Sequence, residues 1–222
     1  MMENEIMIHL KSTQEIYVEF RENGVACIKN ITIDDLLNCI NKSTKVKHQF
    51  QTGLLPKRTV SMLWDMENNR RFIVIEYPEK VTDITYMETT YRNFPLPRIL
   101  FGFTVESSGR ISGVEIGIPG LGKLSPNTQM FTYPFSNVNG FHMCVGMNTM
   151  PHVESLQSLQ NFPQFILSLP DNDDFYSERN NRLELGHRDL MEHLQDKDQQ
   201  YYYDQILVPM NGKTLKDFCK EV

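Results

Sequence analysis

The sequence predicts an α+β protein in which an antiparallel sheet comes first and helices mostly follow it. Apolar and polar residues alternate in several short runs before residue 119, which is the period of strands with one buried face. Short polar or glycine-bearing turns separate these runs, so neighbouring strands are expected to pair as an antiparallel meander. Beyond residue 151 the apolar residues recur at helical spacing instead.

Length and cysteine usage bound the class of protein. A chain of 222 residues can bury a large core without a metal or a disulfide. Its four cysteines form no Cys-x-x-Cys pair and no cluster of zinc-ligand spacing, so we expect reduced thiols in a cytoplasmic protein with no metal and no cofactor. They are Cys27, Cys39, Cys144 and Cys219.

The charge pattern makes two classes of partner unexpected. The formal net charge is −6, and the basic residues are scattered along the chain, which disfavours nucleic acid because phosphate binding needs a basic surface. No run approaches eighteen apolar residues, and the first residues lack the pattern of a secretion signal. The sequence therefore predicts a soluble protein with no membrane partner.

The first fifty residues are expected to form a strand, hairpin and helix extension. Apolar and polar residues alternate over 5–32, and Asn23-Gly24 supplies a hairpin turn. A helix over 31–43 follows, with an acidic first turn and apolar residues at helical spacing. Cys27 and Cys39 are predicted to be core residues of these elements.

A domain boundary is predicted within residues 41–56, which are polar and then carry Gly53 and Pro56. The expected domains are 1–50, an N-terminal strand and helix subdomain, and 51–222, the main domain.

The main sheet is expected to begin with residues 61–78, where two apolar runs flank a turn at 67–70. Residues 94–106 read as a buried strand led by prolines, and a further short turn joins it to a strand over 111–118. Two aromatic residues are expected to anchor this sheet in the core, namely Trp64 and Phe72.

Residues 133–151, YPFSNVNGFHMCVGMNTMP, contain the candidate for chemistry. An extended segment ends near Asn137, Asn139-Gly140 suits a type I′ turn, and the apolar run 141–145 delivers Cys144. The alternative is that Cys144 is a small buried residue, as free cysteines often are.

The remainder of the chain is predicted to be largely helical. The expected segments are a helix over 152–165 broken by Pro163, an acidic loop at 170–175, a charged helix over 176–200 interrupted at Gly186, a strand over 201–209, a turn at Asn211-Gly212 and a terminal helix over 213–222.

The order of PLPRILFGF, ISGVEIGI, a loop and PFSNVNGFHMCVG resembles the bacterial ubiquitin-conjugating-enzyme-like proteins of prokaryotic family D, which include proteins of the PRTRC (ParB-related, ThiF-related) cassettes. The resemblance covers roughly residues 50–155. It implies a ubiquitin-conjugating (UBC-like) fold, in which helices flank the antiparallel meander. It also implies that Cys144 is the catalytic cysteine and Asn137 the asparagine that precedes it in the superfamily.

The resemblance further implies a function. Such enzymes carry a ubiquitin-like protein as a thioester on the cysteine and transfer it to an amine, and the asparagine amide can stabilise the oxyanion that forms. The implied partners are a ubiquitin-like protein, a ThiF-type activating enzyme and a JAB-type isopeptidase. Tyr133-Pro134 stands where the superfamily has His-Pro, so a catalytically inactive member that binds a ubiquitin-like protein or scaffolds a complex is the alternative.

Other side chains are candidates to assist Cys144. A neighbouring imidazolium lowers the pKa of a thiol, and His142 and His152 lie near Cys144 in sequence. The acidic loop, with Asp171, Asp173 and Asp174, follows about thirty residues later, where the conjugating enzymes keep an acidic residue beside the attacking lysine. A cysteine hydrolase that pairs Cys144 with His152 or His187 is a third hypothesis.

Overall fold

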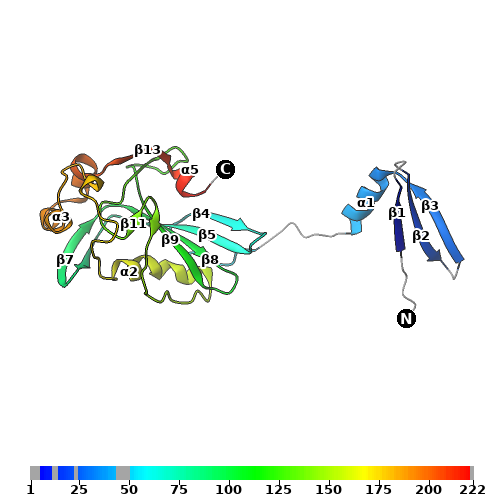
Figure 1. Cartoon of the computed structure of the whole chain (residues 1–222), viewed down its shortest axis with the longest axis horizontal. Helices are drawn as coiled ribbons and strands as arrows, with labels where there is room; N and C mark the ends of the chain where they lie inside the picture. Colours follow the sequence, from blue (N-terminus) through cyan, green and yellow to red (C-terminus); the bar gives the residue numbers. More distant parts are fainter. Residues whose placement is uncertain (1–5, 12–14, 23–24, 44–50, 221–222) are drawn as a thin grey trace. The chain divides into compact units, whose positions relative to one another are not determined.

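The computed structural model describes residues 6–11, 15–22, 25–43 and 51–220 (Figure 1). The chain separates into two compact units, Met1–Gln51 and Thr52–Val222.

The first unit is a three-stranded antiparallel sheet followed by a helix. Strands β1 (Ile6–Leu10), β2 (Ile16–Glu22) and β3 (Val25–Ile31) pair in chain order, and α1 spans Ile33–Ser43. The strands and the helix predicted here are confirmed, whereas the predicted turn at Asn23-Gly24 lies outside the described residues.

The prediction that two cysteines of this unit are core residues is wrong. Cys39 is exposed and Cys27 is only half-buried. The physical reason is that the unit has almost no core of its own: among its described apolar residues, Ile16 alone is buried.

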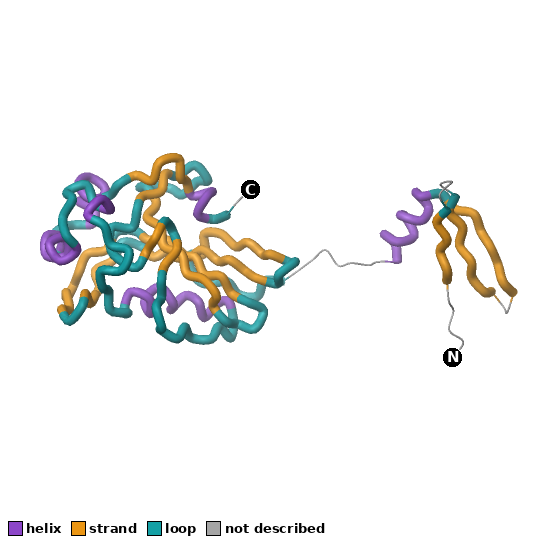
Figure 2. The backbone as a smooth tube through the Cα atoms, in the orientation of Figure 1, coloured by secondary structure: helices purple, strands orange, loops and turns teal. Residues whose placement is uncertain are grey.

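The described residues of the second unit form ten strands and several short helices, whose arrangement is drawn in Figures 1 and 2. The strands are β4 (Thr59–Asp65), β5 (Arg70–Tyr77), β6 (Lys80–Tyr86), β7 (Thr89–Leu96), β8 (Ile99–Val105), β9 (Ile111–Pro119), β10 (Gln129–Phe131), β11 (Val138–Asn139), β12 (His142–Met143) and β13 (Pro209–Thr214). The helices are η1 (Leu156–Asn161), α2 (Phe162–Leu167), η2 (Glu178–Asn180), α3 (His187–Leu194), α4 (Gln199–Tyr201), η3 (Tyr202–Ile206) and α5 (Leu215–Phe218).

The main sheet has the strand order β11-β12-β9-β8-β5-β4, with β10 pairing to β9 and β13. All of these pairs are antiparallel, which confirms the predicted α+β class with an antiparallel sheet. The hairpin of β6 and β7 lies between β5 and β8 in the sequence and forms a separate two-stranded sheet. Within the described residues, no helix is long and apolar enough to span a membrane.

Both faces of the central strands are buried. On one face Phe101 and Phe103 of β8 pack with Phe162 of α2, whose ring lies 5.8 Å from that of Phe103. On the other face Phe72 of β5 joins a smaller cluster that α5 covers with Phe218. The sheet is therefore held between two apolar layers. The β11–β12 hairpin forms the edge of the sheet opposite β4.

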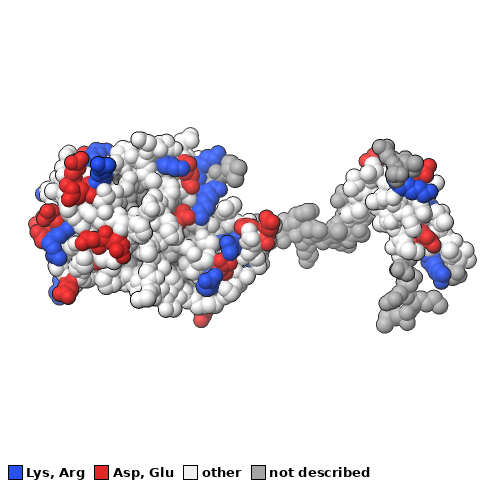
Figure 3. Space-filling view, viewed as in Figure 1, with Lys and Arg blue, Asp and Glu red and all other residues white. Residues whose placement is uncertain are grey.

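Charged side chains are interspersed on this unit. Figure 3 shows basic and acidic residues in mixed groups around a broad uncharged area on the visible face of the second unit.

Two predictions for the sheet need correction. The hairpin of β6 and β7 was not predicted, and residues 94–96 belong to β7 rather than to the following strand. Trp64 is half-buried instead of being a core anchor, because its ring lies at the surface against the guanidinium of Arg71 at 5.1 Å. Phe72, in contrast, is buried as predicted.

The C-terminal third departs most from prediction. Pro163 lies in the first turn of α2, which begins at Phe162, instead of breaking a helix, and this turn tolerates proline. The predicted helix over 176–200 is reduced mainly to α3, which begins directly after Gly186. The predicted strand over 201–209 is wrong, because Tyr202–Ile206 form a π-helical turn that buries both of its end residues.

The last elements are only partly as predicted. Asn211-Gly212 lie inside β13, where the pairing with β10 is irregular, so these residues form a bulge and not a turn between elements. The predicted terminal helix is confirmed in shorter form as α5, and Cys219 beside it is buried.

Candidate functional site

A two-residue turn joins β11 to β12. Asn139 pairs with His142, so the turn residues are Gly140 and Phe141. Gly140 has a φ of +62° and Phe141 does not have a positive φ, which is the pattern of a type II′ turn. The predicted type I′ turn at Asn139-Gly140 is therefore wrong by one residue.

The position of Phe141 explains this shift. Its ring meets the ring of Phe218 edge-on at 5.0 Å, and its carbonyl accepts a hydrogen bond from the Ile116 amide at 2.8 Å. Both contacts tie Phe141 to the sheet and to α5. Because a shift of one residue would turn Phe141 away from this pocket, packing fixes the register of the hairpin.

The hairpin presents Cys144 at the surface. Met143 points into the core with 8% of its surface exposed, and Cys144, the next residue, is exposed. The Cys144 amide donates to the carbonyl of Asn137 at 2.7 Å, so the chain is held where it leaves the sheet. The alternative that Cys144 is a buried core residue is wrong.

Two hollows meet at Cys144. The larger, called here the β9 groove, has a volume of about 260 Å³. It is lined by Ile111, Ser112, Gly113, Val114, His142, Met143, Cys144, Val145, Gly146 and Met150. The smaller, called here the Asp171 hollow, has a volume of about 80 Å³. It is lined by Asn137, Met143, Cys144, Val145, Gly146, Asn148, Leu169, Pro170, Asp171, Asn172 and Asp174.

The hollows offer Cys144 two different surroundings. The β9 groove is lined by apolar residues and glycines with His142 as its titratable neighbour, whereas the Asp171 hollow brings two carboxylates to the other side of the cysteine. An exposed thiol with an apolar groove on one side and an acid on the other has room for an acyl group and for a basic nucleophile.

Asn137 connects the cysteine segment to the acidic loop. It has a φ of +62°, a conformation that asparagine tolerates better than most residues. Its backbone amide donates to the carbonyl of Asp174 at 2.7 Å. Its side-chain amide donates to Asp171 Oδ1 at 3.1 Å and to Ser136 Oγ at 3.3 Å. Both side-chain N–H groups are thus engaged by neighbours in the protein.

Asp171 is the most perturbed carboxyl group of the site. Burial raises its pKa to about 6, and the hydrogen bonds from Asn137 and Ser136 offset part of that rise. Its amide donates to the Thr85 carbonyl at 2.7 Å, and its carbonyl accepts from the Met87 amide at 2.8 Å. These bonds fix Asp171 against the end of β6, so its carboxyl group is held in a defined position.

A buried histidine holds the rest of the acidic loop. The carboxylate of Asp173 accepts a hydrogen bond from the Tyr86 hydroxyl at 2.8 Å and lies 3.3 Å from Nδ1 of His187. His187 is 4% exposed, and its ring stacks on that of Tyr176 at 4.4 Å between centroids. Burial lowers the pKa of His187, and Asp173 opposes that change. Asp173 therefore anchors the loop and does not line either hollow.

The three candidate histidines have different surroundings. His142 is exposed on β12 beside the β9 groove. His152 Nε2 lies 2.6 Å from the Ser108 carbonyl, at the turn between β8 and β9, and its ring covers Gly109. His187 is bound to Asp173. Neither His152 nor His187 lines either hollow at Cys144, so the described structure does not place the base of the hydrolase hypothesis beside the thiol.

The described part of the chain contains no group of three or more His, Cys, Asp or Glu side chains placed to hold a metal ion.

Part of the site could be predicted from the sequence. The acidic loop was singled out by its composition, and the structure brings Asp171 and Asp174 to the hollow beside Cys144. The hydrogen bond from Asn137 to Asp171 joins residues 34 positions apart, and no local sequence pattern predicts it. The anchor Tyr86 was missed because β6 and β7 were not predicted, and His187 was considered only as a base for Cys144.

Comparison with known proteins adds no family assignment, since no family model, no curated protein and no solved structure matches the chain.

Proposed function

We propose that the chain is a ubiquitin-conjugating-enzyme-like transferase with a UBC-like second unit, in which Cys144 carries a ubiquitin-like protein as a thioester and passes it to an amine. The observation that carries the proposal is that exposed Cys144 shares the Asp171 hollow with Asn137 and with a carboxyl group whose pKa is about 6. The sequence resemblance to the bacterial conjugating-enzyme-like proteins supports the same assignment of Cys144 and Asn137.

Loading is a thioester exchange. The Cys144 thiolate attacks the thioester carbonyl of the ubiquitin-like protein on the cysteine of a ThiF-type activating enzyme, and that cysteine leaves as a thiolate. One C–S bond forms and one breaks, so the exchange is nearly balanced in energy. The exchange needs an exposed sulfur, which the position of Cys144 after β12 provides.

Transfer to an amine requires a base. The amine nitrogen attacks the thioester carbonyl on Cys144, the C–S bond breaks, and Cys144 leaves as a thiolate while an amide bond forms. The attacking nitrogen must lose a proton, and Asp171 is the proposed acceptor because it is ionised above pH 6 and lies in the same hollow. A carboxyl group with a pKa near the working pH suits this role.

Asn137 has a proposed role both before and after Asp171 takes the proton. In the resting site its amide donates to Asp171 and Ser136, and the first of these bonds favours the ionised carboxylate. Once Asp171 has taken the proton, its carboxyl group accepts hydrogen bonds less strongly. One N–H of Asn137 is then available for the oxyanion, a contact whose loss costs about 2.7–4 kcal/mol in a protease.

The loading step can be tested with three forms of the chain. Wild type, Cys144→Ser and Cys39→Ser are each incubated with ATP, a ThiF-type activating enzyme and its ubiquitin-like protein, and adducts are separated without reductant. We expect a thiol-sensitive adduct for wild type and for Cys39→Ser, which removes another exposed cysteine. An adduct that survives Cys144→Ser in thiol-sensitive form rejects the assignment.

A catalytically inactive protein of the same fold that binds a ubiquitin-like protein, or scaffolds a bacterial complex, is the second candidate. It is favoured by the resting hydrogen bonds of Asn137, which occupy both amide protons. This candidate predicts unchanged affinity for the ubiquitin-like protein in Cys144→Ala and no adduct under any loading condition. Calorimetric titration of the Cys144→Ala variant, beside the loading assay, distinguishes the two.

A further inference from the structure

The sheet of the first unit has one strongly apolar face. In antiparallel pairs, residues directly opposite one another point to the same side of the sheet. Ile6, Ile8 and Leu10 of β1 stand opposite Phe20, Val18 and Ile16 of β2. Strand β3 adds Val25, Cys27 and Ile31 to this side through its pairs with β2. This set of side chains is called here the apolar face.

The opposite face of the same sheet is polar. His9 stacks on Tyr17 at 4.4 Å between ring centroids and lies 3.4 Å from the carboxylate of Glu19. Arg21 and Asn30 lie on the same side, with Met7, Ala26 and Ile28 as apolar exceptions. A sheet with one polar and one apolar face is built to be covered on the apolar side.

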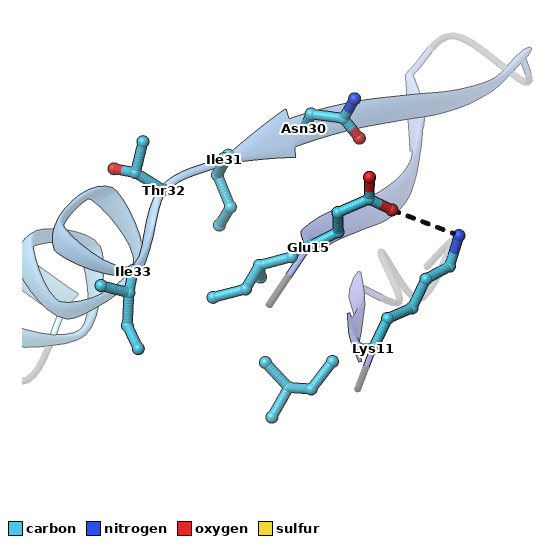
Figure 4. Close-up of a pocket in the computed structure, with 8 residues that line it drawn as sticks. Lys11, Glu15, Asn30, Ile31, Thr32 and Ile33 are labelled. Carbon is cyan, nitrogen blue, oxygen red and sulfur yellow. Dashed lines mark ion pairs between the residues drawn. The ribbon is translucent and has the colours of Figure 1, made fainter. Parts of the chain in front are cut away.

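The apolar face is nevertheless open. Leu10 is 71% exposed and Ile6 is 63% exposed, whereas Ile16 is buried. The helix does not close it, because Ile33 and Leu37 of α1 are themselves 63% and 51% exposed. A groove of about 740 Å³ remains between this face and the start of the helix. Figure 4 shows its margin, where Lys11 and Glu15 form an ion pair at 3.9 Å.

Exposure of so much apolar surface to water is unfavourable. A unit of about fifty residues rarely supplies enough core by itself, and oligomerisation is one of the usual remedies. Seven large apolar residues of the apolar face and of α1 are 44% to 71% exposed, namely Ile6, Ile8, Leu10, Val25, Ile33, Leu37 and Ile40. A monomer rarely leaves a contiguous apolar patch of more than a few hundred Å² uncovered. A standard interface buries about 800 Å² on each partner, and this many exposed apolar side chains can form the centre of one.

We propose that a second copy of this chain covers the apolar face, so that two first units pack sheet against sheet around a two-fold axis. Such an interface must be complementary to itself. Two apolar sheets meet this condition because their side chains interdigitate about 10 Å apart. The proposal is independent of the function proposed for Cys144.

The charges around the apolar face agree with self-association. Lys29 brings a charge onto this side of the sheet through its pair with Val18, and its aliphatic stem can lie along apolar surface with the ammonium group in water. Lys11 and Glu15 at the margin neutralise each other. The described part of the face has no block of one sign that would select an oppositely charged partner.

A matched pair of substitutions tests the proposal. Ile8→Arg places a charge in the middle of the apolar face, and Ile28→Arg places the same charge on the polar face of the same sheet, at a similarly exposed position. Sedimentation equilibrium of the full chain over a concentration series gives the dimer dissociation constant. We expect Ile8→Arg to raise it at least tenfold and Ile28→Arg to change it less than threefold. A wild-type chain that stays monomeric at all concentrations overturns the proposal.

Thiol labelling of the unmodified chain gives a second readout. Cys27 lies on the apolar face, and Cys39 lies on α1 away from the stripe of Ile33 and Leu37. As the chain concentration rises, labelling of Cys27 should slow at least tenfold while labelling of Cys39 stays constant.

The other outcomes contradict the proposal in recognisable ways. Protection of Cys27 that does not depend on concentration means that the chain covers its own face. Protection that appears only when the ubiquitin-like protein is added means that a different protein is the occupant.

Discussion

Asn137 and Asp171 form the link on which the site depends. Asn137 has a left-handed backbone conformation, and its carbonyl accepts a hydrogen bond from the Cys144 amide. Its own backbone amide donates to the Asp174 carbonyl, and its side-chain amide donates to the Asp171 carboxylate. The position of the thiol and the ionisation of the carboxyl group are therefore set by the same residue. A substitution that moves the Cys144 thiol should therefore also change the ionisation of Asp171, and a substitution of Asp171 should also move the thiol.

Removing the carboxylate should separate loading from transfer. In Asp171→Asn the exchange that charges Cys144 needs no base and should stay within about threefold of wild type. Discharge to free lysine should slow by at least about 100-fold, the lower end of what a general base contributes. Single-turnover assays with pre-charged protein measure the second step, and Asp196→Asn, an exposed carboxylate on another loop, is the control. Equal slowing of both steps contradicts the role of Asp171 as the base.

The raised pKa of Asp171 also has a consequence for stability. Its pKa in the folded chain is about 6, above the usual value near 3.9 of an unfolded chain, so the folded state binds the proton more tightly. The contribution of Asp171 to folding is most favourable below about pH 4 and declines as the pH rises to about 6. The loss is at most about 3 kcal/mol.

Urea unfolding at several pH values tests this linkage. The unfolding free energy of Asp171→Asn, relative to wild type, should increase between pH 4 and pH 6.5 and then remain constant. Asp196→Asn should show no such step. A difference that falls over this range means that the pKa of Asp171 is lowered by the fold.

At the residue level, the sequence was informative where chemistry is local. An exposed Cys144 could be expected from its turn-rich context and from the resemblance, and the acidic loop from its composition. The assignment of Asn137 as an oxyanion donor could not include its resting bonds to Asp171 and Ser136, because those depend on how two distant segments dock.

At the scale of elements, the inserted hairpin of β6 and β7 decides where the acidic loop lies. Asp171 bonds to Thr85 and Met87, and Asp173 bonds to Tyr86, so the loop is fixed by the end of this hairpin. The hairpin escaped prediction because β7 contains Pro95 near its end and β6 has few apolar residues. Long apolar strands such as β5 and β8 were recognised because both of their faces are buried.

Packing of one aromatic ring over the sheet gives a prediction for the element that supports the site. A Cβ atom on Gly102 of β8 would lie 2.4 Å from Cζ of Phe72, whereas a Cβ on Gly113 of β9 would meet nothing closer than 3.4 Å. Gly102→Ala should therefore lower the unfolding free energy by about 1–3 kcal/mol, the usual cost of overpacking.

Gly113→Ala is the matched control for that experiment and should change stability by less than about 0.5 kcal/mol. Chemical denaturation of both variants provides the comparison. Equal stability of the two variants means that Phe72 does not rest on Gly102.

At the scale of the whole molecule, stability resides in the second unit. Apart from Ile16, every buried apolar side chain of the described residues lies between Phe72 and Cys219. Residues 52–222 alone should therefore unfold cooperatively, with a midpoint within a few degrees of the second unit in the full chain. Thermal unfolding followed by circular dichroism measures this. The fragment should also be monomeric, because it lacks the apolar face.

The same fragment shows what the first unit contributes to activity. If that unit serves association between copies, residues 52–222 should charge Cys144 at the rate of the full chain. A large loss of charging in a folded fragment means instead that the first unit docks the activating enzyme.

The central claim is that Cys144 carries an acyl group, and intact-protein mass spectrometry of the charged chain tests it most directly. After incubation with ATP, the activating enzyme and the ubiquitin-like protein, wild type should gain the mass of one ubiquitin-like protein less one water. Peptide mapping should locate the bond at Cys144, and thiol treatment should release it. The claim is contradicted if wild type gains no such mass while the activating enzyme itself is charged, or if the acyl group maps to another residue.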